Sequence, residues 1–293
     1  MQQGEESEEL VSCHWLAENL ASDSMRIVEV IDGANLDVYS EGHIPGAIYW
    51  RWKESLWDDT MREFLSPEKF SRLMRKSGVG PETTLVLYSN SCQFAHYAFW
   101  VCLMRGHTKV KILHGNRTLW IKEKLPLVRS IPSIEPVDYP IRSTDESSRI
   151  GREEILAGLH KKDRVLLDVR EFEEFVGERV SPSHEYMGFD HGAERKGHIP
   201  GARHLCYRNL LNDDDTFKTL DKLRTLFDEA GATRDKELVF YCRLSHRASL
   251  AWFAARFLLR YPQTKIYDGS WTEWGSIVGV PIENNTIQIS SMY

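Results

Sequence analysis

A cysteine followed by basic residues is the part of this sequence best suited to chemistry. Cys242 comes directly after the apolar run 238–241 and directly before a polar loop. The loop is rich in basic and polar side chains: Arg243, Ser245, His246 and Arg247. Because the thiolate is the reactive form of cysteine, positive charge beside Cys242 favours a nucleophile. A single cysteine is more often a buried structural residue, but the basic, polar loop favours the functional interpretation here.

The residues on either side of Cys242 predict a strand, a tight loop and a helix. The run 238–241 has the length and apolar character of a buried strand. Beyond Arg247, apolar residues recur with a helical period: Leu250, Phe253, Ala254, Phe257 and Leu258. In α/β sheets, ligands bind at the carboxyl ends of strands, and the start of a helix offers N–H groups and a favourable dipole to an anion. We therefore predict that Cys242 lies where a thiolate is stabilised.

The chain contains an internal repeat of domain size. Three segments recur in the same order: EGHIPGA at 41–47 as KGHIPGA at 196–202, LVLY at 85–88 as LVFY at 238–241, and GNRTLW at 115–120 as GSWTEW at 269–274. The offsets are 155, 153 and 154 residues. A nearly constant spacing of this size indicates a duplicated domain and excludes a solenoid of short repeats.

Each copy alternates short apolar strands with helical patterns, which predicts an α/β fold with a central, mostly parallel sheet flanked by helices. The predicted strands are 27–31, 85–88 and 110–113, then 165–169, 238–241 and 265–267; the predicted helices are 67–76, 95–105 and 220–230. Ser66 and Thr219 are the predicted N-caps and Gly78 the residue that ends the helix 67–76. A proline-containing linker, 128–148, separates the predicted domains 8–128 and 149–285.

The two copies differ in two places. Between Asp168, which matches Glu29, and its GHIPGA segment, the second copy has about 16 additional residues, roughly 176–195. This insert carries basic side chains: Arg179, His184, His191 and Arg195. A loop of this length is expected to form a wall of the site. At the position of Cys242 the first copy has Ser89, so the first domain is predicted to be non-catalytic.

The composition excludes several classes of function. The 293 residues carry a net charge of −6, which gives no support for a nucleic-acid or anionic-membrane partner. The five cysteines form no CxxC pair, which argues against a disulfide framework or a zinc site and fits a reducing cytoplasm. The first ten residues do not resemble a signal peptide, and no apolar run approaches the length of a membrane span. The expectation is a cytoplasmic protein, monomeric or homodimeric.

Four elements of the sequence carry a family resemblance: the paired GHIPGA segments, DVR at 168–170, YCRLSHRAS at 241–249 and YDGSWTEW at 267–274. They resemble the two-domain rhodanese family, the thiosulfate and 3-mercaptopyruvate sulfurtransferases, over nearly the whole chain. The loop looks closest to bacterial thiosulfate sulfurtransferases, one branch of which carries CQTHHRS, and does not resemble the CGSGVT loop typical of mercaptopyruvate enzymes. The resemblance implies a catalytic C-terminal domain, a persulfide on Cys242, transfer of sulfur from thiosulfate to cyanide or a thiol, and no metal or organic cofactor.

The resemblance and the residues together predict individual roles. Cys242 is the nucleophile, and Arg247 either braces the loop or binds the anionic end of the donor. The predicted substrate-binding residues are Arg243, Leu244, Ser245, His246, Arg179 and Arg195. The last two are candidates because vertebrate rhodaneses have a substrate-binding arginine where this chain has Glu174. The cations Arg243 and Arg247 favour thiosulfate, a compact dianion, over mercaptopyruvate.

Several interpretations stay open at the level of sequence. His43 and His198 are expected to be structural, because one of them lies in the domain without a nucleophile. Asp168 is either polar scaffolding or a residue that orients the loop. Trp271 and Trp274 are expected to shape a pocket wall or a domain interface. Alternative functions are a 3-mercaptopyruvate sulfurtransferase, a non-catalytic sulfur-sensing or protein-binding module, and a phosphatase. A phosphatase loop has the form C-x5-R, whereas this chain has C-x4-R.

Overall fold

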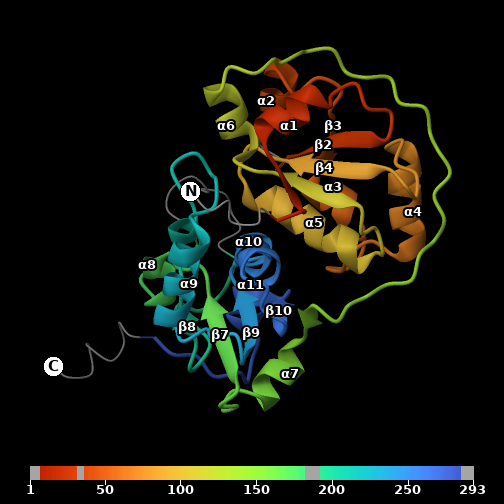
Figure 1. The fold of residues 1–293 in the computed structure, drawn as a ribbon. Helices are drawn as coiled ribbons and strands as arrows, with labels where there is room; N and C mark the ends of the chain where they lie inside the picture. Colours follow the sequence, from red (N-terminus) through yellow and green to blue (C-terminus); the bar gives the residue numbers. More distant parts are fainter. Residues whose placement is uncertain (1–6, 32–35, 182–191, 285–293) are drawn as a thin grey trace. The chain divides into compact units, whose positions relative to one another are not determined.

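The computed structural model describes residues 7–31, 36–181 and 192–284. It divides into two compact units, which are described separately. Unit 1 is Met1–Glu146 with Asp213–Phe217, and unit 2 is Ser147–Asn212 with Lys218–Tyr293. Each unit contains one parallel sheet with helices packed against it (Figure 1). The predicted α/β class is therefore confirmed.

Unit 1 has a five-stranded sheet in the order β1-β5-β4-β2-β3. Its strands are β1 (Leu10–Val11), β2 (Met25–Ile31), β3 (Ile48–Arg51), β4 (Thr84–Tyr88) and β5 (Val110–Leu113). Its helices are α1 (Cys13–Glu18), α2 (Leu36–Glu41), α3 (Trp52–Leu56), α4 (Pro67–Lys76), α5 (Gln93–Met104) and α6 (Asn116–Lys122). Helix α4 has the predicted bounds: the Ser66 hydroxyl accepts a hydrogen bond from the N–H of Lys69, and Gly78 has a φ of +65°.

Unit 2 repeats this order as β6-β10-β9-β7-β8, which is the arrangement expected of a duplicated domain. Its strands are β6 (Arg149–Ile150), β7 (Arg164–Asp168), β8 (Arg203–His204), β9 (Glu237–Tyr241) and β10 (Thr264–Tyr267). Its helices are α7 (Arg152–Ala157), α8 (Phe172–Phe175), the 3-10 turn η1 (Tyr207–Leu210), α9 (Leu220–Glu229), α10 (His246–Phe253), the π-helical turn η2 (Ala254–Leu258) and α11 (Ser270–Trp274). Thr219 caps α9 as predicted, since its hydroxyl accepts from the N–H of Lys222.

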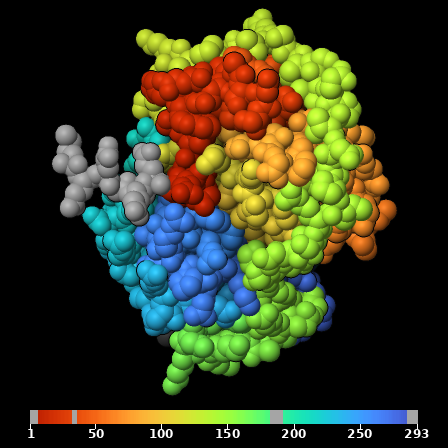
Figure 2. Space-filling view, turned by 45° about the vertical axis from the view of Figure 1, so that its right-hand side comes forward, coloured from red at the N-terminus to blue at the C-terminus, as the bar shows by residue number. Residues whose placement is uncertain are grey.

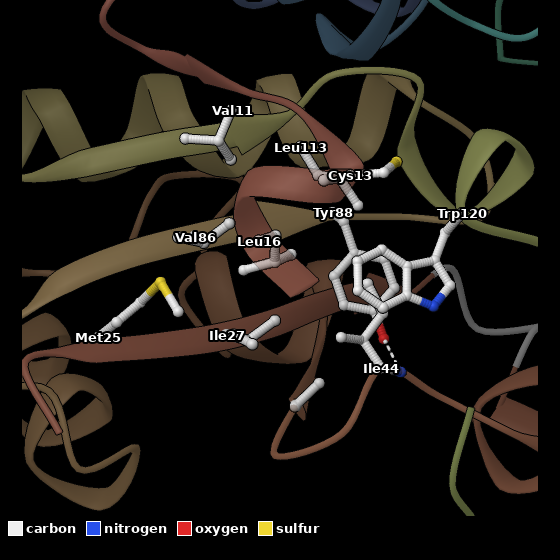
Figure 3. Packing of buried hydrophobic residues seen from close by; sticks show 11 residues of the cluster. Val11, Cys13, Leu16, Met25, Ile27, Ile44, Val86, Tyr88, Leu113 and Trp120 are labelled. Carbon is white, nitrogen blue, oxygen red and sulfur yellow. Dashed lines mark hydrogen bonds between the residues drawn. The ribbon is translucent and has the colours of Figure 1, made fainter. Parts of the chain in front are cut away.

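The repeated GHIPGA segments are held by equivalent hydrogen bonds in the two units. The N–H of Ile44 donates to the Tyr88 hydroxyl, and the N–H of Ile199 donates to the Tyr241 hydroxyl, both at 3.2 Å. Figure 3 shows the bond between Ile44 and Tyr88 within the buried apolar cluster of unit 1. The repeat therefore preserves a contact between this segment and a central strand, which explains why it occurs in both domains.

His43 and His198 have the structural role expected from the sequence. The two ring nitrogens of His43 lie 3.0 and 3.2 Å from backbone carbonyl oxygens. Those of His198 lie 2.8 Å from the Phe175 carbonyl oxygen and 3.1 Å from a Glu283 carboxylate oxygen. Both rings are buried. Because each nitrogen has a partner that fixes the GHIPGA turn, these histidines hold the fold together.

The linker after unit 1's last helix is an extended segment that packs along unit 1 (Figure 2). Tyr139 is its buried anchor. The Ser71 hydroxyl donates to the Tyr139 carbonyl oxygen at 2.7 Å, and Nδ1 of His107 lies 3.2 Å from the Tyr139 hydroxyl. Extended chain without helix or strand is what the sequence predicted. No helix in the described part of the chain is long and apolar enough to cross a membrane.

Two buried histidines of unit 1 should make the protein's stability depend on pH. Burial lowers the pKa of His96 and of His107 to about 4, because the imidazolium is poorly solvated there. Their pKa in an unfolded chain is about 6.5. The folded protein thus binds these protons less readily than the unfolded chain. Stability is therefore fully present above about pH 6.5 and is lost as pH falls toward 4.

We expect the free energy of unfolding to fall by about 3 kcal/mol per histidine between these limits, since one pKa unit corresponds to 1.36 kcal/mol. Urea unfolding at a series of pH values measures this. His107→Gln removes the titrating group and should flatten the profile below pH 6.5, whereas His160→Gln, at an exposed position, should not. An unchanged profile in His107→Gln would show that other groups control the acid instability.

Candidate active site

Cys242 lies at the carboxyl end of the central strand β9, as the sequence predicts. Strand β9 is paired with β7 on one side and β10 on the other, with Tyr241 opposite Asp168. The chain then turns through residues 242–245 and enters α10 at His246. Ser245 has a φ of +72°, which makes this turn tight. Cys242 is only 1% exposed, so its surroundings are set by the loop and by the segments packed on it.

The segment after β10 holds the carbonyl groups of the loop. The N–H of Trp271 donates to the Cys242 carbonyl oxygen at 2.9 Å, and the N–H of Thr272 donates to the Arg243 carbonyl oxygen at 3.2 Å. The Thr272 hydroxyl donates to the same Arg243 oxygen at 2.8 Å. In a trans peptide the C=O and the following N–H point in opposite directions. The N–H groups of Arg243 and Leu244 therefore point away from α11.

Two further polar groups of the loop are fixed by residues at and after the end of β10. The N–H of Cys242 donates to the Ser270 hydroxyl oxygen at 3.2 Å. The Ser245 hydroxyl donates to the carbonyl oxygen of Asp268 at 2.7 Å and lies 3.1 Å from its carboxylate. Ser245 was predicted to bind substrate, but its buried side chain is engaged with Asp268. The contacts of the hydroxyl therefore do not favour the predicted role of this side chain in substrate binding.

Arg247 forms a buried ion pair with Glu174 of α8. Its two terminal nitrogens lie 2.6 and 3.0 Å from the two Glu174 carboxylate oxygens, and both residues are buried. Burial opposes the charged form of Arg247, yet the Glu174 carboxylate raises the pKa of Arg247 well above its usual value. Of the two roles left open by the sequence, this geometry favours bracing of the loop. Glu174 is therefore the counter-ion of Arg247.

Asp168 serves as the counter-ion of Arg170. The Arg170 Nε lies 2.9 Å from one Asp168 carboxylate oxygen and Nη2 lies 2.5 Å from the other, with both residues fully buried. Nη2 also donates to the Gly197 carbonyl oxygen, and the guanidinium lies 4.6 Å from the Trp271 ring centroid. The pair thus links the end of β7 to the GHIPGA segment and to α11. Asp168 is polar scaffolding beneath the site.

The two arginines of the insert have structural contacts. Arg195 donates to four backbone carbonyl oxygens at and after the end of α11: those of Trp274, Gly275, Ile277 and Val280. Arg179 forms ion pairs with Glu171 and Glu173. These contacts hold the ends of α11 and α8 and do not favour the substrate-binding role that the sequence suggested. His184 and His191 lie outside the described residues.

Arg243, Leu244 and His246 complete the loop. Arg243 and Leu244 are partly exposed, whereas His246 is buried. The described end of the insert approaches Arg243, since a Cβ added at Gly192 would lie 2.3 Å from its Nε. Gly192 has a φ of +76°, a conformation that side chains disfavour. Gly192, in the described part of the insert, is therefore packed against Arg243 at a position that favours glycine.

Trp271 and Trp274 belong to the core of unit 2. Both are fully buried in its apolar cluster. The indole N–H of Trp271 donates to the Arg195 carbonyl oxygen at 3.0 Å, and that of Trp274 to the Pro281 carbonyl oxygen at 2.8 Å. Their role within the unit is to position α11, whose first N–H groups hold the Cys242 loop.

Unit 1 repeats the frame of this site with Ser89 in the place of Cys242. The N–H of Ser89 donates to the Asn116 side chain, as that of Cys242 does to Ser270. However, the Ser89 hydroxyl donates to the Ser91 carbonyl oxygen at 2.7 Å. A loop carbonyl therefore faces the position that corresponds to the Cys242 sulfur, where it would repel an anion.

Comparisons with known proteins agree with this architecture. The sequence model of the protein family "Rhodanese-like domain" matches residues 12–123 and 152–277 of this chain. The chain is 41% identical to "Sulfur carrier protein TtuD" of Thermus thermophilus, over 94% of this chain and 96% of that protein. It is 39% identical to a "Putative thiosulfate sulfurtransferase" of Haloferax volcanii, with the same coverage.

Solved structures share the fold. The crystal structure of YnjE superposes with a TM-score of 0.81 at 24% identity, and covers 94% of this chain and 68% of YnjE. The wild-type structure of EanB gives a TM-score of 0.81 at 24% identity, with 94% of this chain and 69% of EanB covered. On the family match in both halves and the identity to its members, the chain belongs to the rhodanese family of sulfurtransferases, with two rhodanese-like domains.

Proposed function

We propose that this protein transfers the sulfane sulfur of thiosulfate to cyanide or a thiol through a persulfide on Cys242. The observation that carries the proposal is the geometry of the loop 242–247. Cys242 lies at the end of β9, and α10 begins four residues later. The carbonyl oxygens of Cys242 and Arg243 accept hydrogen bonds from the N–H groups of Trp271 and Thr272. N–H groups left facing a sulfur atom stabilise negative charge as an oxyanion hole does. Unit 1, with Ser89 at the matching position, is proposed to be non-catalytic.

The reaction needs two displacement steps. The Cys242 thiolate attacks the outer sulfur of thiosulfate, the bond between the two sulfur atoms of the donor breaks, and its electron pair leaves with sulfite. Cys242 then carries one extra sulfur as a persulfide anion. Cyanide or an acceptor thiolate attacks that outer sulfur and restores the Cys242 thiolate. No oxidant or reductant is consumed beyond donor and acceptor.

The loop also argues against phosphatase chemistry. A phosphatase of the C-x5-R type uses its arginine to hold a phosphoryl group, which needs a larger ring of backbone N–H groups. Here four residues separate Cys242 from Arg247, and both terminal nitrogens of Arg247 contact Glu174. The proposed substrate is therefore a donor of one sulfur atom. A purely sulfur-binding role, without turnover, is the second candidate, because one relative carries the name of a sulfur carrier.

A cyanolysis assay tests the proposal. The protein is treated with thiosulfate, and the Cys242 peptide is examined by mass spectrometry for a gain of one sulfur atom, about 32 Da, that cyanide removes. Multiple turnovers with cyanide support the enzyme, whereas a single stoichiometric release supports the carrier. The absence of any sulfur on Cys242 would contradict both.

The donor preference is a further prediction. Because Glu174 neutralises the charge of Arg247, we assign the binding of the anionic donor to the charge of Arg243. The Arg243 side chain is partly exposed. A charge-assisted hydrogen bond contributes roughly 1.5–3 kcal/mol. We expect kcat/KM for thiosulfate to exceed that for 3-mercaptopyruvate by about tenfold. Arg243→Gly should raise KM for thiosulfate and change kcat little, as loss of uniform binding does.

Steady-state cyanolysis with both donors measures this preference. Arg224→Ala, on the exposed face of α9, is the matched control and should behave as the wild type. A clear preference for 3-mercaptopyruvate, or an unchanged KM in Arg243→Gly, would contradict the assignment of Arg243 as the donor-binding cation.

A further inference from the structure

Thr272 lies outside the catalytic loop but bonds directly to it. Its backbone N–H and its hydroxyl both donate to the carbonyl oxygen of Arg243, at 3.2 and 2.8 Å. A carbonyl oxygen has two lone pairs, so Thr272 alone occupies the accepting capacity of this group. Thr272 is the third residue of α11, where a backbone N–H has no acceptor within its own helix. The contact therefore gives a hydrogen-bond partner both to the Thr272 N–H in the first turn of α11 and to the Arg243 carbonyl oxygen of the loop.

These two hydrogen bonds from Thr272 fix the orientation of the peptide group between Arg243 and Leu244. With the Arg243 oxygen held against α11, the N–H of Leu244 points to the opposite side. The preceding carbonyl, that of Cys242, accepts a hydrogen bond from the N–H of Trp271 at 2.9 Å. Loop peptides have a soft rotation, and a rotated peptide would present a carbonyl oxygen to the anion in place of an N–H.

The other half of the chain provides the contrast. Thr118 occupies the position of Thr272 in the repeat, 154 residues earlier. It is exposed, and its hydroxyl donates to the Asp215 carboxylate at 3.2 Å. In that unit the Ser91 carbonyl faces the Ser89 hydroxyl. The same residue type thus holds a loop carbonyl in the unit with the cysteine and bonds elsewhere in the unit with serine.

We propose that Thr272 is a positioning residue for sulfur transfer: by holding the Arg243 carbonyl against α11, it directs the N–H of Leu244 toward the sulfur that Cys242 carries. The inference rests on the persulfide mechanism proposed above. The Leu244 N–H then stabilises the charge that develops on the outer sulfur during attack and in the persulfide. Because Thr272 acts through the loop and does not touch the donor, its effect is on kcat and not on donor binding.

The test compares variants that differ in the hydroxyl group. Thr272→Val removes the hydroxyl at nearly constant volume, and Thr272→Ser keeps it. Loss of a complete oxyanion-hole donor costs about 100-fold or more in kcat. The backbone N–H of Thr272 still holds the carbonyl in the valine variant, so we expect kcat with thiosulfate to fall by about tenfold at nearly constant KM. Thr272→Ser should stay within about twofold of the wild type, as should the matched control Thr118→Val.

Thermal unfolding of each variant separates this role from a general loss of structure, and Thr272→Ala serves as a second hydroxyl-free variant if the valine does not fold. A wild-type kcat in the folded hydroxyl-free variants, a change confined to KM, or equal losses in Thr272→Ser and Thr272→Val would overturn the proposal. The wild-type protein is tested first for a persulfide on Cys242. Its absence would refute the mechanism itself, whereas its presence with unaffected variants would refute only the role of Thr272.

Discussion

Cys242→Ser is expected to abolish sulfur transfer, with a loss on the order of 10⁴-fold or more, as removal of a nucleophile does. Serine has nearly the same size, so the loop and its hydrogen bonds should persist. Its hydroxyl stays protonated at neutral pH, and it cannot form a persulfide. Mass spectrometry after thiosulfate treatment should show no cyanide-labile sulfur on the 242 peptide, and the cyanolysis rate should fall to background.

Two other cysteines provide the controls for this experiment. Cys92 is buried in unit 1 at the start of α5, where the matching nucleophile position is taken by Ser89. Cys206 is partly buried after β8, and burial raises the pKa of its thiol, which disfavours the thiolate. Cys92→Ser and Cys206→Ser should therefore keep most of the activity. Sulfur found on Cys92 in the wild-type protein would reverse the assignment of the catalytic domain.

Breaking the ion pair between Arg247 and Glu174 is expected to have the second largest effect. Arg247→Ala leaves the Glu174 carboxylate buried without a counter-ion, and Glu174→Ala leaves the Arg247 guanidinium in the same state. Removal of one partner of a buried pair costs about 3–5 kcal/mol of stability. Activity should fall as well, because Arg247 is the second residue of α10 and its side chain ties the start of that helix to α8.

A double variant separates the two effects. Glu174→Leu combined with Arg247→Met replaces the pair by apolar groups of similar volume and should recover much of the stability. It should not recover the kcat, since the loop has lost its brace. Urea unfolding and cyanolysis on the same preparations measure both quantities. If each single replacement cost less than about 1 kcal/mol, the pair would behave like an exposed one and the brace would be refuted.

Unit 1 offers a matched control for this pair. Arg117 and Glu29 form a buried ion pair there, with Nη1 3.4 Å from the carboxylate. Arg117→Ala should also destabilise the protein, but kcat per folded molecule should stay near that of the wild type. A comparable loss of kcat in Arg117→Ala would show that destabilisation in general, and not the brace on α10, lowers the activity of the Arg247 variants.

Local sequence patterns were sufficient for much of the fold. The apolar run before Cys242 corresponds to β9, and the helical period after it corresponds to α10 and the π-helical turn η2 that continues it. Ser66 and Gly78 bound the helix α4. Such features depend on neighbouring residues: a capping side chain, a left-handed glycine, or the alternation of apolar positions. The duplication was visible because each copy needs the same contacts, such as that between Ile44 and Tyr88.

The partners of the charged side chains were decided only by the tertiary structure. From the sequence, Glu174 was a negative charge where vertebrate rhodaneses have a substrate-binding arginine. Arg247 was a cation that either braces the loop or binds the donor. The fold joins them across 73 residues of chain and cancels their charges. Arg195, a candidate for substrate binding, instead holds carbonyl groups at the end of α11. A sequence gives the number and sign of charges, but not the directions in which buried side chains point.

The orientation of the loop 242–247 is also a property of the tertiary structure. The sequence determined that Cys242 follows a strand and precedes a helix, because both elements have their own periodicity. Whether the loop presents N–H or carbonyl groups depends on residues elsewhere in the chain. Thr272 holds the Arg243 carbonyl across 29 residues, whereas in the other copy Thr118 bonds to Asp215. Identical residue types at repeat-equivalent positions thus have different hydrogen-bond partners. A peptide group adopts the orientation that its partners in space impose.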